Sequence, residues 1–547
     1  MMAGTAALDR LGLSQTHKDL FALSMEVLDS NYRPPLLWSS AKLSSWYSVG
    51  LLARGDNGDV ERAIKLLRNS LHLQDLDPAF EQNYGSFKGH LSLPYSSGSD
   101  PLWVGDIYDS YEDRSPDPNN ALFFTMAGMM VETLFPDKIP ADLRQDIRKA
   151  MHKACLGNAR REGGWHGDDM WPSYSNPWFL RCVCSSFVGN LVDDAGLTAM
   201  AEGWAKEAVD LFNQHDTPGE FNSPTYAGVT IMALALAQYC PEESTIFRAA
   251  PGLLKSIWKS LSEIYNPSLL NLAGPWDRAY GYCMTQYYAT VGVNITSAVG
   301  LDADYPMPRP LNGCEHGSDV ALAPMQMLTA PYAEAGLTAA LRSKFTKLYA
   351  DHSHTALSSF PPHDKRPRRY TFWIAQGLSV GGVEFDEDQL GGPKGIQEQF
   401  NPGVIQWDSG DHGAGCGWIS VWPDNACCSM VATSNSLTIV YKRPIDFPDG
   451  PRGDKVSLRI GCLPFLQLDG QSFVENKQSL PGLDVALSGS IVDHGTRSLT
   501  FCKAQKIHGA YYYDLSYSFP SELRGRCDPT LVISFKQTTP PSYPLDF

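Results

Sequence analysis

The sequence predicts two domains: an N-terminal (α/α)6 toroid of helical hairpins over residues 1–354 and an antiparallel β-sandwich over residues 355–547. The length of 547 residues exceeds what one hydrophobic core usually supports. Apolar residues recur at helical spacing up to about residue 350. Beyond that point, short alternating or β-branched runs lie between turn residues, which is typical of antiparallel strands. An irregular helical array is the alternative to the toroid.

The helical part is expected to consist of consecutive hairpins. About twelve helices arranged in pairs is the number that six hairpins require. Residues 73–119 interrupt the pattern with Gly, Pro, Ser and Tyr, so we expect a long functional insertion there. The expected helices begin near Ser14 and continue over 44–53, 59–71, 120–135, 140–157, 177–191, 197–214, 225–239, 244–265, 282–299, 318–329 and 335–351.

The C-terminal part is expected to contain at least ten strands. The segment Pro361–Arg369, rich in proline and basic residues, is expected to link the two domains. His352 and His354 resemble a metal-binding fragment, but we place them at a solvated helix end because no third ligand is evident. The expected strands cover 370–374, 379–385, 417–421, 429–433, 437–441, 456–460, 483–491, 498–503, 511–517 and 530–535.

Composition excludes several classes of function. The formal net charge is -16, from 60 acidic and 44 basic residues, which argues against binding to nucleic acid or an anionic membrane. No run approaches the roughly 18 apolar residues of a membrane span. The N-terminal residues do not resemble a secretion signal, so we expect a cytoplasmic protein. The 12 cysteines include no CxxC pair and are expected to be mostly buried thiols.

The first polar cluster lies in the segment WHGDDMWPSYSNPW, residues 165–178. His166 beside Asp168 and Asp169 can act as a base oriented by a carboxylate. The alternative is a loop in which these carboxylates cap backbone amides. The spacing matches no recognised metal site, so no metal is expected.

The same segment ends at the start of a helix. Asn176 suits the N-cap position, with Pro177 as the first helical residue. Alternatively, the Asn176 amide and the Tyr174 phenol point into the mouth of the barrel, where they can hold or protonate a substrate.

The second cluster is EFNSPTY, Glu220 to Tyr226. Ser223 suits a helix cap, yet Glu220, Asn222 and Tyr226 exceed what one cap needs. The helix that follows is apolar nearly all round, as an inner barrel helix should be. A buried Glu220 needs a partner, and Arg278 is the candidate.

The third cluster is GPWDRAYG, residues 274–281. Asp277 and Arg278 are expected to form an ion pair, while Trp276 and Tyr280 would supply aromatic walls. His316 lies in a weaker motif of the same kind, EHGSD, where it has either a structural or a site role.

These clusters give one predicted site at the barrel mouth, with no metal and no cofactor. The predicted catalytic residues are His166, Asp168, Tyr174, Glu220 and Tyr226. The predicted substrate-binding residues are Asp169, Trp171, Asn176, Asn222, Trp276, Asp277, Arg278, Tyr280 and His316.

The motifs YSNPWFLR, EFNSPTY and GPWDRAYG resemble those of fungal proteins of a class that combines an α/α toroid with a β-sandwich. The architecture resembles that of heparinase-type and alginate-type polysaccharide lyases and of six-hairpin glycosidases. The lyase resemblance implies a Tyr or His base, with Asn and Arg or His neutralising a uronate carboxylate. The toroid class also includes linalool dehydratase-isomerase, an acid–base enzyme, so the resemblance does not choose a reaction.

The favoured hypothesis is a cofactor-independent acid–base enzyme, of lyase, isomerase or cyclase type. Because no export signal is visible, we expect a small, partly apolar metabolite of specialised biosynthesis as its substrate. One alternative is a polysaccharide lyase or glycosidase acting on a uronate-containing or neutral glycan. Another is a non-catalytic glycan-binding or scaffold protein. A closed apolar cavity would indicate the metabolite, an open basic and aromatic groove the polymer, and a filled pocket the scaffold.

Overall fold

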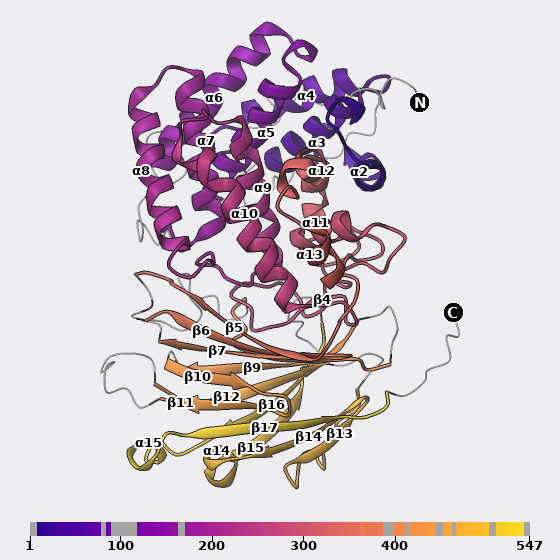
Figure 1. The fold of residues 1–547 in the computed structure, drawn as a ribbon, viewed down its shortest axis with the longest axis vertical. Coiled ribbons are helices and arrows are strands. Elements are labelled where there is room, and N and C mark those ends of the chain that lie inside the picture. The colour runs from indigo at the N-terminus through magenta and orange to yellow at the C-terminus, as the bar shows by residue number, and fades with distance from the viewer. Residues whose placement is uncertain are drawn as a thin grey trace.

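The structure is a computed structural model in which helices form one half of the molecule and antiparallel strands the other (Figure 1). The predicted order, a helical part followed by an antiparallel β part, is confirmed. The structure describes residues 8–77, 84–88, 117–161, 170–362, 364, 366–386, 399–410, 415–425, 427–442, 452–461, 466–502 and 510–540.

The helical half has an inner and an outer layer. Each inner helix is buried around almost its whole circumference, because its residues are apolar or small on every side. Outer helices bury one face and expose the other. The inner helices are α3 (Ala41–Arg54), α5 (Asn120–Leu134), α7 (Ser175–Leu191), α9 (Pro224–Leu236), α11 (Thr290–Val299) and α12 (Ala323–Ala333). The outer helices are α2 (Gln15–Asn31), α4 (Asp59–His72), α6 (Ala141–Ala159), α8 (Ala195–Phe212) and α10 (Thr245–Ile264).

The helical layer closes because α12 packs against α2 and α3, which come from the other end of the domain. The buried carboxylate of Glu334, which follows α12, fixes this closure. His17 Nε2 of α2 lies 3.3 Å from its Oε1, Arg342 donates to its Oε2 at 2.6 Å, and Ser297 also donates to it. Burial alone would raise the pKa of Glu334, but these hydrogen bonds hold that pKa below its ordinary value.

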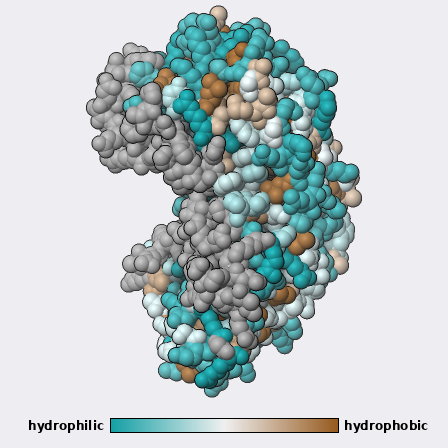
Figure 2. Space-filling model, turned by 90° about the vertical axis from the view of Figure 1, so that its left-hand side faces the viewer, coloured by the Kyte–Doolittle hydropathy of each residue, from teal (hydrophilic) through white to brown (hydrophobic). Residues whose placement is uncertain are grey.

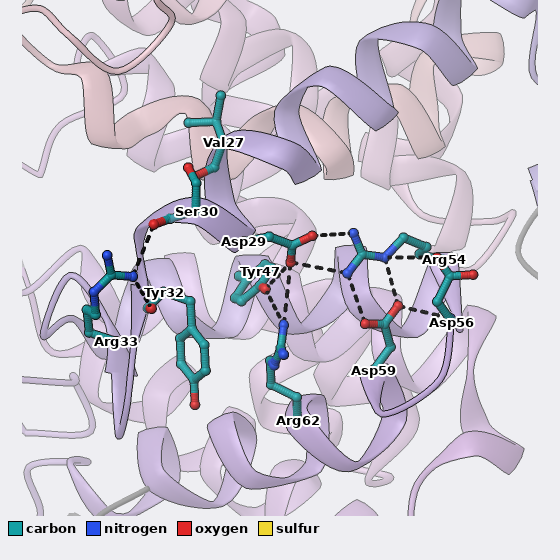
Figure 3. A network of polar contacts seen from close by, with 10 residues as sticks. All are labelled: Val27, Asp29, Ser30, Tyr32, Arg33, Tyr47, Arg54, Asp56, Asp59 and Arg62. Carbon is teal, nitrogen blue, oxygen red and sulfur yellow. Dashed lines mark hydrogen bonds and ion pairs between the residues drawn. The ribbon is translucent and has the colours of Figure 1, made fainter. Parts of the chain in front are cut away.

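A second polar network joins the first three helices (Figure 3). Asp29 of α2 accepts hydrogen bonds from Tyr47 and, at 2.5 Å, from Arg54, both on α3. Arg54 also contacts Asp59 at the start of α4, and Arg62 of α4 donates to the Tyr47 hydroxyl at 3.0 Å. Burial would raise the pKa of Asp29, but the hydrogen bonds from Arg54 and Tyr47 lower it, so the carboxylate stays charged. These contacts tie α2, α3 and α4 to one another.

Two expected helices are shorter than the sequence suggests. The segment 282–299 becomes helical only at Thr290, because the backbone of Tyr282 instead accepts hydrogen bonds from Asn271 and Gln406. The segment 335–351 contains only α13 (Ala339–Lys344).

The placement of His352 and His354 at a helix end is wrong. They begin strand β5 (His352–Ser358), which pairs with β6 (Arg368–Ala375), so that His352 lies opposite Ile374. The alternating exposure along β5 is that of a strand with one buried face.

The described strands of the β half form one continuous antiparallel sheet, curved into layers in Figure 1. The expected strands are present, and β5, β8 and β13 are additional. Strands β7 and β8 are buried on both faces, whereas β11 and β17 alternate between buried and half-exposed residues. After β5 and β6, the strands are β7 (Leu378–Asp386), β8 (Gly403–Trp407), β9 (Gly417–Asn425), β10 (Cys427–Ala432), β11 (Ser436–Tyr441), β12 (Arg452–Gly461), β13 (Lys477–Leu480), β14 (Leu483–Ser488), β15 (Thr496–Phe501), β16 (Tyr513–Ser518) and β17 (Thr530–Gln537).

The described part of the face in Figure 2 is mostly hydrophilic, and its hydrophobic residues appear as small separate areas. None of the helices in the described ranges is both long enough and apolar enough to cross a membrane.

The closure of the helical ring can be tested at Glu334. Replacing it with Gln removes the charge that faces His17 and Arg342, so we expect the free energy of unfolding to fall by about 1–3 kcal/mol. Calorimetry should show a lower melting temperature for Glu334→Gln than for the control Glu243→Gln, whose side chain is exposed. Equal melting temperatures for the two variants would contradict a stabilising role for this carboxylate.

Candidate active site at the junction of the two halves

The polar clusters meet where the helical half contacts the sheet, beside the short strand β4 (Asn271–Leu272) labelled in Figure 1. The chain after β4 lies directly on the sheet. Trp276 and Asn401 exchange two backbone hydrogen bonds of 3.0 Å, and Ala279 donates to Gln399 at 3.0 Å. A side chain at Gly381 of β7 would place its Cβ 1.7 Å from the carbonyl oxygen of Gly274, so this approach requires glycine. The sheet therefore holds the segment that carries Arg278 and Tyr280.

The buried carboxylate of Glu220 connects the first two clusters to the third. Its Oε2 accepts from the backbone N–H of Asn176 at 2.9 Å and from the Asn176 side-chain amide at 2.8 Å. Its Oε1 accepts from Arg278 Nη1 at 3.0 Å. Glu220 thus satisfies the N-terminus of α7, which has no cap from its own side chains. The predicted Glu220–Arg278 pair is confirmed.

Arg278 lies against two tyrosine rings. Its guanidinium is 4.1 Å from the ring centre of Tyr226 and 5.1 Å from that of Tyr174, and its Nε donates to Gln399 at 3.2 Å. Burial opposes the charge, but the phenols and the Glu220 carboxylate raise the pKa of Arg278, so it stays protonated. Its side chain is 14% exposed against 2% for Glu220, so Arg278 is the member of the pair that solvent reaches.

Tyr226 and Tyr280 form the accessible part of the cluster. Their hydroxyl oxygens are 2.9 Å apart, and the ring of Tyr280 lies 3.8 Å from that of His316. His316 Nδ1 in turn lies 3.1 Å from a carboxylate oxygen of Asp319. Burial raises the pKa of Tyr226 well above its ordinary value, and Arg278 only partly offsets this. The Tyr226 phenol therefore keeps its proton at neutral pH, and its partner Tyr280 lies against a histidine that a carboxylate orients.

Behind Tyr226 lies a small apolar pocket between α9 and α10. It is lined by side chains that include Phe221, Ile257 and Leu261, with Glu220 and Asn222 at one end. Its free space of about 30 Å³ suffices for one or two water molecules. This pocket is too small to hold a sugar ring or a metabolite.

Asp277 faces away from Arg278. It pairs with Arg368 of β6 at 2.6 Å, and Arg368 also contacts Asp364 at 2.5 Å. The predicted Asp277–Arg278 ion pair is therefore wrong. Two carboxylates share one buried guanidinium, and burial is the main cause that raises the pKa of Asp277 to about 7.

Three predicted substrate-binding residues have structural contacts. Asn222 has a positive φ of 58° and donates to the carbonyls of Ala273 and Pro275. Trp276 is 1% exposed and packs on Tyr282 and the sheet, so it forms no wall of an open site. Trp171 is half-buried in the turn before α7.

Three of the predicted site residues cannot be placed. His166, Asp168 and Asp169 lie outside the described residues. Ser223 caps α9 as expected, whereas Asn176 lies inside α7 and is not its cap.

Sequence reasoning missed Gln399, Arg368 and Asp364 as partners of this cluster. Two of them belong to the segment interpreted as a basic linker, where a single acidic residue, Asp364, among four Lys and Arg residues was the available signal. Asp319 was part of the EHGSD motif but had no assigned role; its i,i+3 spacing from His316 suggests the contact.

The chain matches two known protein families. Residues 18–331 match the family described as "Domain of unknown function (DUF8769)", which is more than half of the sequence. The chain belongs to this family. Residues 350–536 match a second one, "Domain of unknown function (DUF8770)". All three polar clusters lie within the DUF8769 region, and their partners Arg368 and Gln399 lie within the DUF8770 region. None of the curated proteins matches the sequence.

Solved structures give distant likenesses. A chondroitin AC lyase of Streptomyces coelicolor A3, in complex with chondroitin sulphate, is 9% identical, with 97% of this chain and 82% of that chain covered and a TM-score of 0.43. A heparinase III gene product is 10% identical, with coverage of 90% and 78% and a TM-score of 0.33. Heparan sulfate lyase from Pedobacter heparinus is 10% identical, with coverage of 89% and 78% and a TM-score of 0.31. At these TM-scores the likenesses carry no argument about activity.

The raised pKa of Asp277 predicts a specific pH dependence of stability. The folded protein keeps a proton on Asp277 that the unfolded chain releases between about pH 4 and pH 7, so raising the pH through this window lowers the free energy of unfolding. Asp277→Asn removes this contribution. We expect the stability of wild type relative to the variant to fall by on the order of 1 kcal/mol per pH unit in this window and to level off above it. Thermal melts of both proteins across pH 4–8 measure this difference, and a constant difference would contradict the assignment.

Proposed function

We propose that this protein is an acid–base lyase that cleaves a uronate-containing glycan by β-elimination, and that it needs no cofactor. The observation that carries the proposal is the hydrogen-bonded pair Tyr226–Tyr280, which has the Arg278 guanidinium on one side and the His316 ring on the other. A proton donor, a candidate base and a fixed cation thus share one accessible place.

Arg278 would bind the uronate carboxylate. Glu220 holds one nitrogen of the guanidinium and Gln399 another, which leaves Nη2 without a hydrogen bond among the described residues. Neutralising the carboxylate makes the adjacent C–H more acidic, because the negative charge that develops in the transition state is delocalised into it. Glu220 would act as a positioning residue rather than as the predicted proton-transfer group, since hydrogen bonds engage both of its oxygens.

Proton transfer would use the other side of the cluster. His316, oriented by Asp319, would remove the proton next to the carboxylate, either directly or through the Tyr280 hydroxyl. Tyr226, whose raised pKa keeps it protonated, would donate to the departing glycosidic oxygen. The C–H and C–O bonds break, a C=C bond forms, and the proton taken by the base balances the proton given to the leaving group.

The small-metabolite hypothesis is less well supported. It requires an enclosed apolar cavity of substrate size, whereas the apolar pocket that the described residues form beside Tyr226 holds only about 30 Å³. The half-exposed tyrosines, His316 and Arg278 instead match the aromatic and basic surface expected for a polymer. A cytoplasmic location stays a prediction. A glycan inside the cell would agree with that location and with the proposed substrate class.

Turnover can be measured directly, because β-elimination creates a C=C bond conjugated to a carboxylate, which absorbs in the ultraviolet. We expect wild-type protein to increase this absorbance with one of a panel of uronate polymers, such as chondroitin sulfate, heparan sulfate, alginate and pectate. Tyr226→Phe should lower kcat by about 10²–10⁴-fold, because it removes the proton donor. Tyr239→Phe is the control, since Tyr239 lies in a 3-10 turn at the far end of α9.

The other outcomes separate the alternatives. Chain cleavage without new absorbance would indicate a glycosidase, and glycan binding without cleavage would indicate a non-catalytic binding protein. Equal turnover by Tyr226→Phe and Tyr239→Phe would contradict the role of Tyr226.

A further inference from the structure

Two cysteines meet at the junction, a few residues from the proposed site. Cys283 is three positions after Tyr280, and Cys416 directly precedes β9. Their sulfur atoms lie 2.7 Å apart, closer than two unbonded sulfurs ordinarily approach. Both residues are 3% exposed. A disulfide bond is about 2.05 Å long, so the two sulfurs need to move less than about 1 Å to form one.

Polar contacts hold the two sulfurs in place. The backbone N–H of Cys416 donates to the Cys283 sulfur at 3.1 Å. The side-chain amides of Asn271 and Gln406 lie 3.8 Å and 4.0 Å from the Cys416 sulfur. The Cys283 sulfur also lies 3.4 Å from the Cys416 carbonyl oxygen, and the Cys416 sulfur lies 3.8 Å from that of Tyr282. These contacts keep the two sulfurs facing each other, and deprotonation of one of them supplies the nucleophile for disulfide formation.

A metal site is a weaker explanation of this pair. Within the described ranges, no third His, Cys, Asp or Glu completes a cluster with the two sulfurs. Two thiolates alone do not make the four-ligand shell of a structural zinc site.

We propose that Cys283 and Cys416 form a disulfide under oxidising conditions and thereby fix the segment that carries Arg278 and Tyr280 to the sheet. With hydrogen peroxide as the oxidant, the Cys283 thiolate attacks one peroxide oxygen and the O–O bond breaks, giving a sulfenic acid and, after protonation, water. The Cys416 sulfur then attacks the Cys283 sulfur and loses its proton, while the S–O bond breaks and a second water leaves. Two thiols and one peroxide thus give one disulfide and two waters.

The bond would act over a long stretch of sequence. It joins residues 133 positions apart, one in the DUF8769 region and one in the DUF8770 region. A cross-link that closes so long a loop restricts the unfolded chain strongly. The oxidised protein should therefore melt at a higher temperature than the reduced one. The proposal does not depend on the lyase function, because neither thiol takes part in proton transfer.

The test is peptide mapping under non-reducing conditions. Wild-type protein is treated with hydrogen peroxide, its remaining thiols are alkylated, and the digest is analysed by mass spectrometry. We expect a cross-linked peptide pair containing Cys283 and Cys416, lighter by two hydrogen atoms than the two peptides together, and its loss after treatment with dithiothreitol. The melting temperature should rise by roughly 2–4 °C on oxidation.

Single variants make the result specific. Cys283→Ser and Cys416→Ser should each abolish the cross-link and the rise in melting temperature. Cys527→Ser is the matched control: among the described residues the Cys527 sulfur donates to the backbone carbonyl of Leu523 and contacts no second sulfur, so this variant should keep both. Recovery of Cys283 and Cys416 as alkylated thiols in oxidised wild-type protein would overturn the proposal. This outcome is measured on the wild-type protein, so it depends neither on the folding of a variant nor on enzymatic activity.

Discussion

The arrangement of the candidate site depends on one buried carboxylate. Glu220 is almost inaccessible to water, so its charge must be compensated by the protein. Helix α7 supplies a backbone N–H and the Asn176 amide, and the segment after β4 supplies Arg278. These contacts fix the relative positions of the start of α7, the residues before α9 and the segment after β4. Arg278, once fixed, lies against Tyr226 and so defines the accessible end of the cluster.

The second constraint comes from the sheet. Arg368 is fully buried between Asp277 and Asp364, and the backbone of Trp276 pairs with Asn401. The segment that carries Arg278 and Tyr280 is therefore held from below by the β half and from above by Glu220. The chain carries a net charge of -16, yet this site contains an arginine whose side chain is 14% exposed. Overall acidity therefore says little about the charge of a ligand that binds at one place.

Much of the fold follows from local sequence patterns. Helical periodicity and β-branched alternation correctly predicted the main helices and ten strands, because each element buries a face that its own residues define. The Glu220–Arg278 pair was also predictable, since a buried carboxylate next to an apolar helix needs a cation. The predicted Asp277–Arg278 pair is wrong because the cation nearest to Asp277 in the sequence is not its partner in the fold. Arg368 lies 91 positions from Asp277, and no local pattern marks a charge in a surface-like segment as buried. Strand β5 was missed because its polar exposed face resembles a solvated helix end.

The central claim is that Arg278, held by Glu220, binds the carboxylate of an acidic sugar. The most direct measurement is the dissociation constant of a uronate oligosaccharide for wild-type protein and for Arg278→Lys, determined by titration calorimetry. Lysine keeps the positive charge but has only one nitrogen. The arginine guanidinium can contact Glu220 and Gln399 with two nitrogens and still offer the third to the ligand. We predict that the variant binds at least about tenfold more weakly, which corresponds to about 1.4 kcal/mol. Equal affinity in the two proteins would contradict the claim.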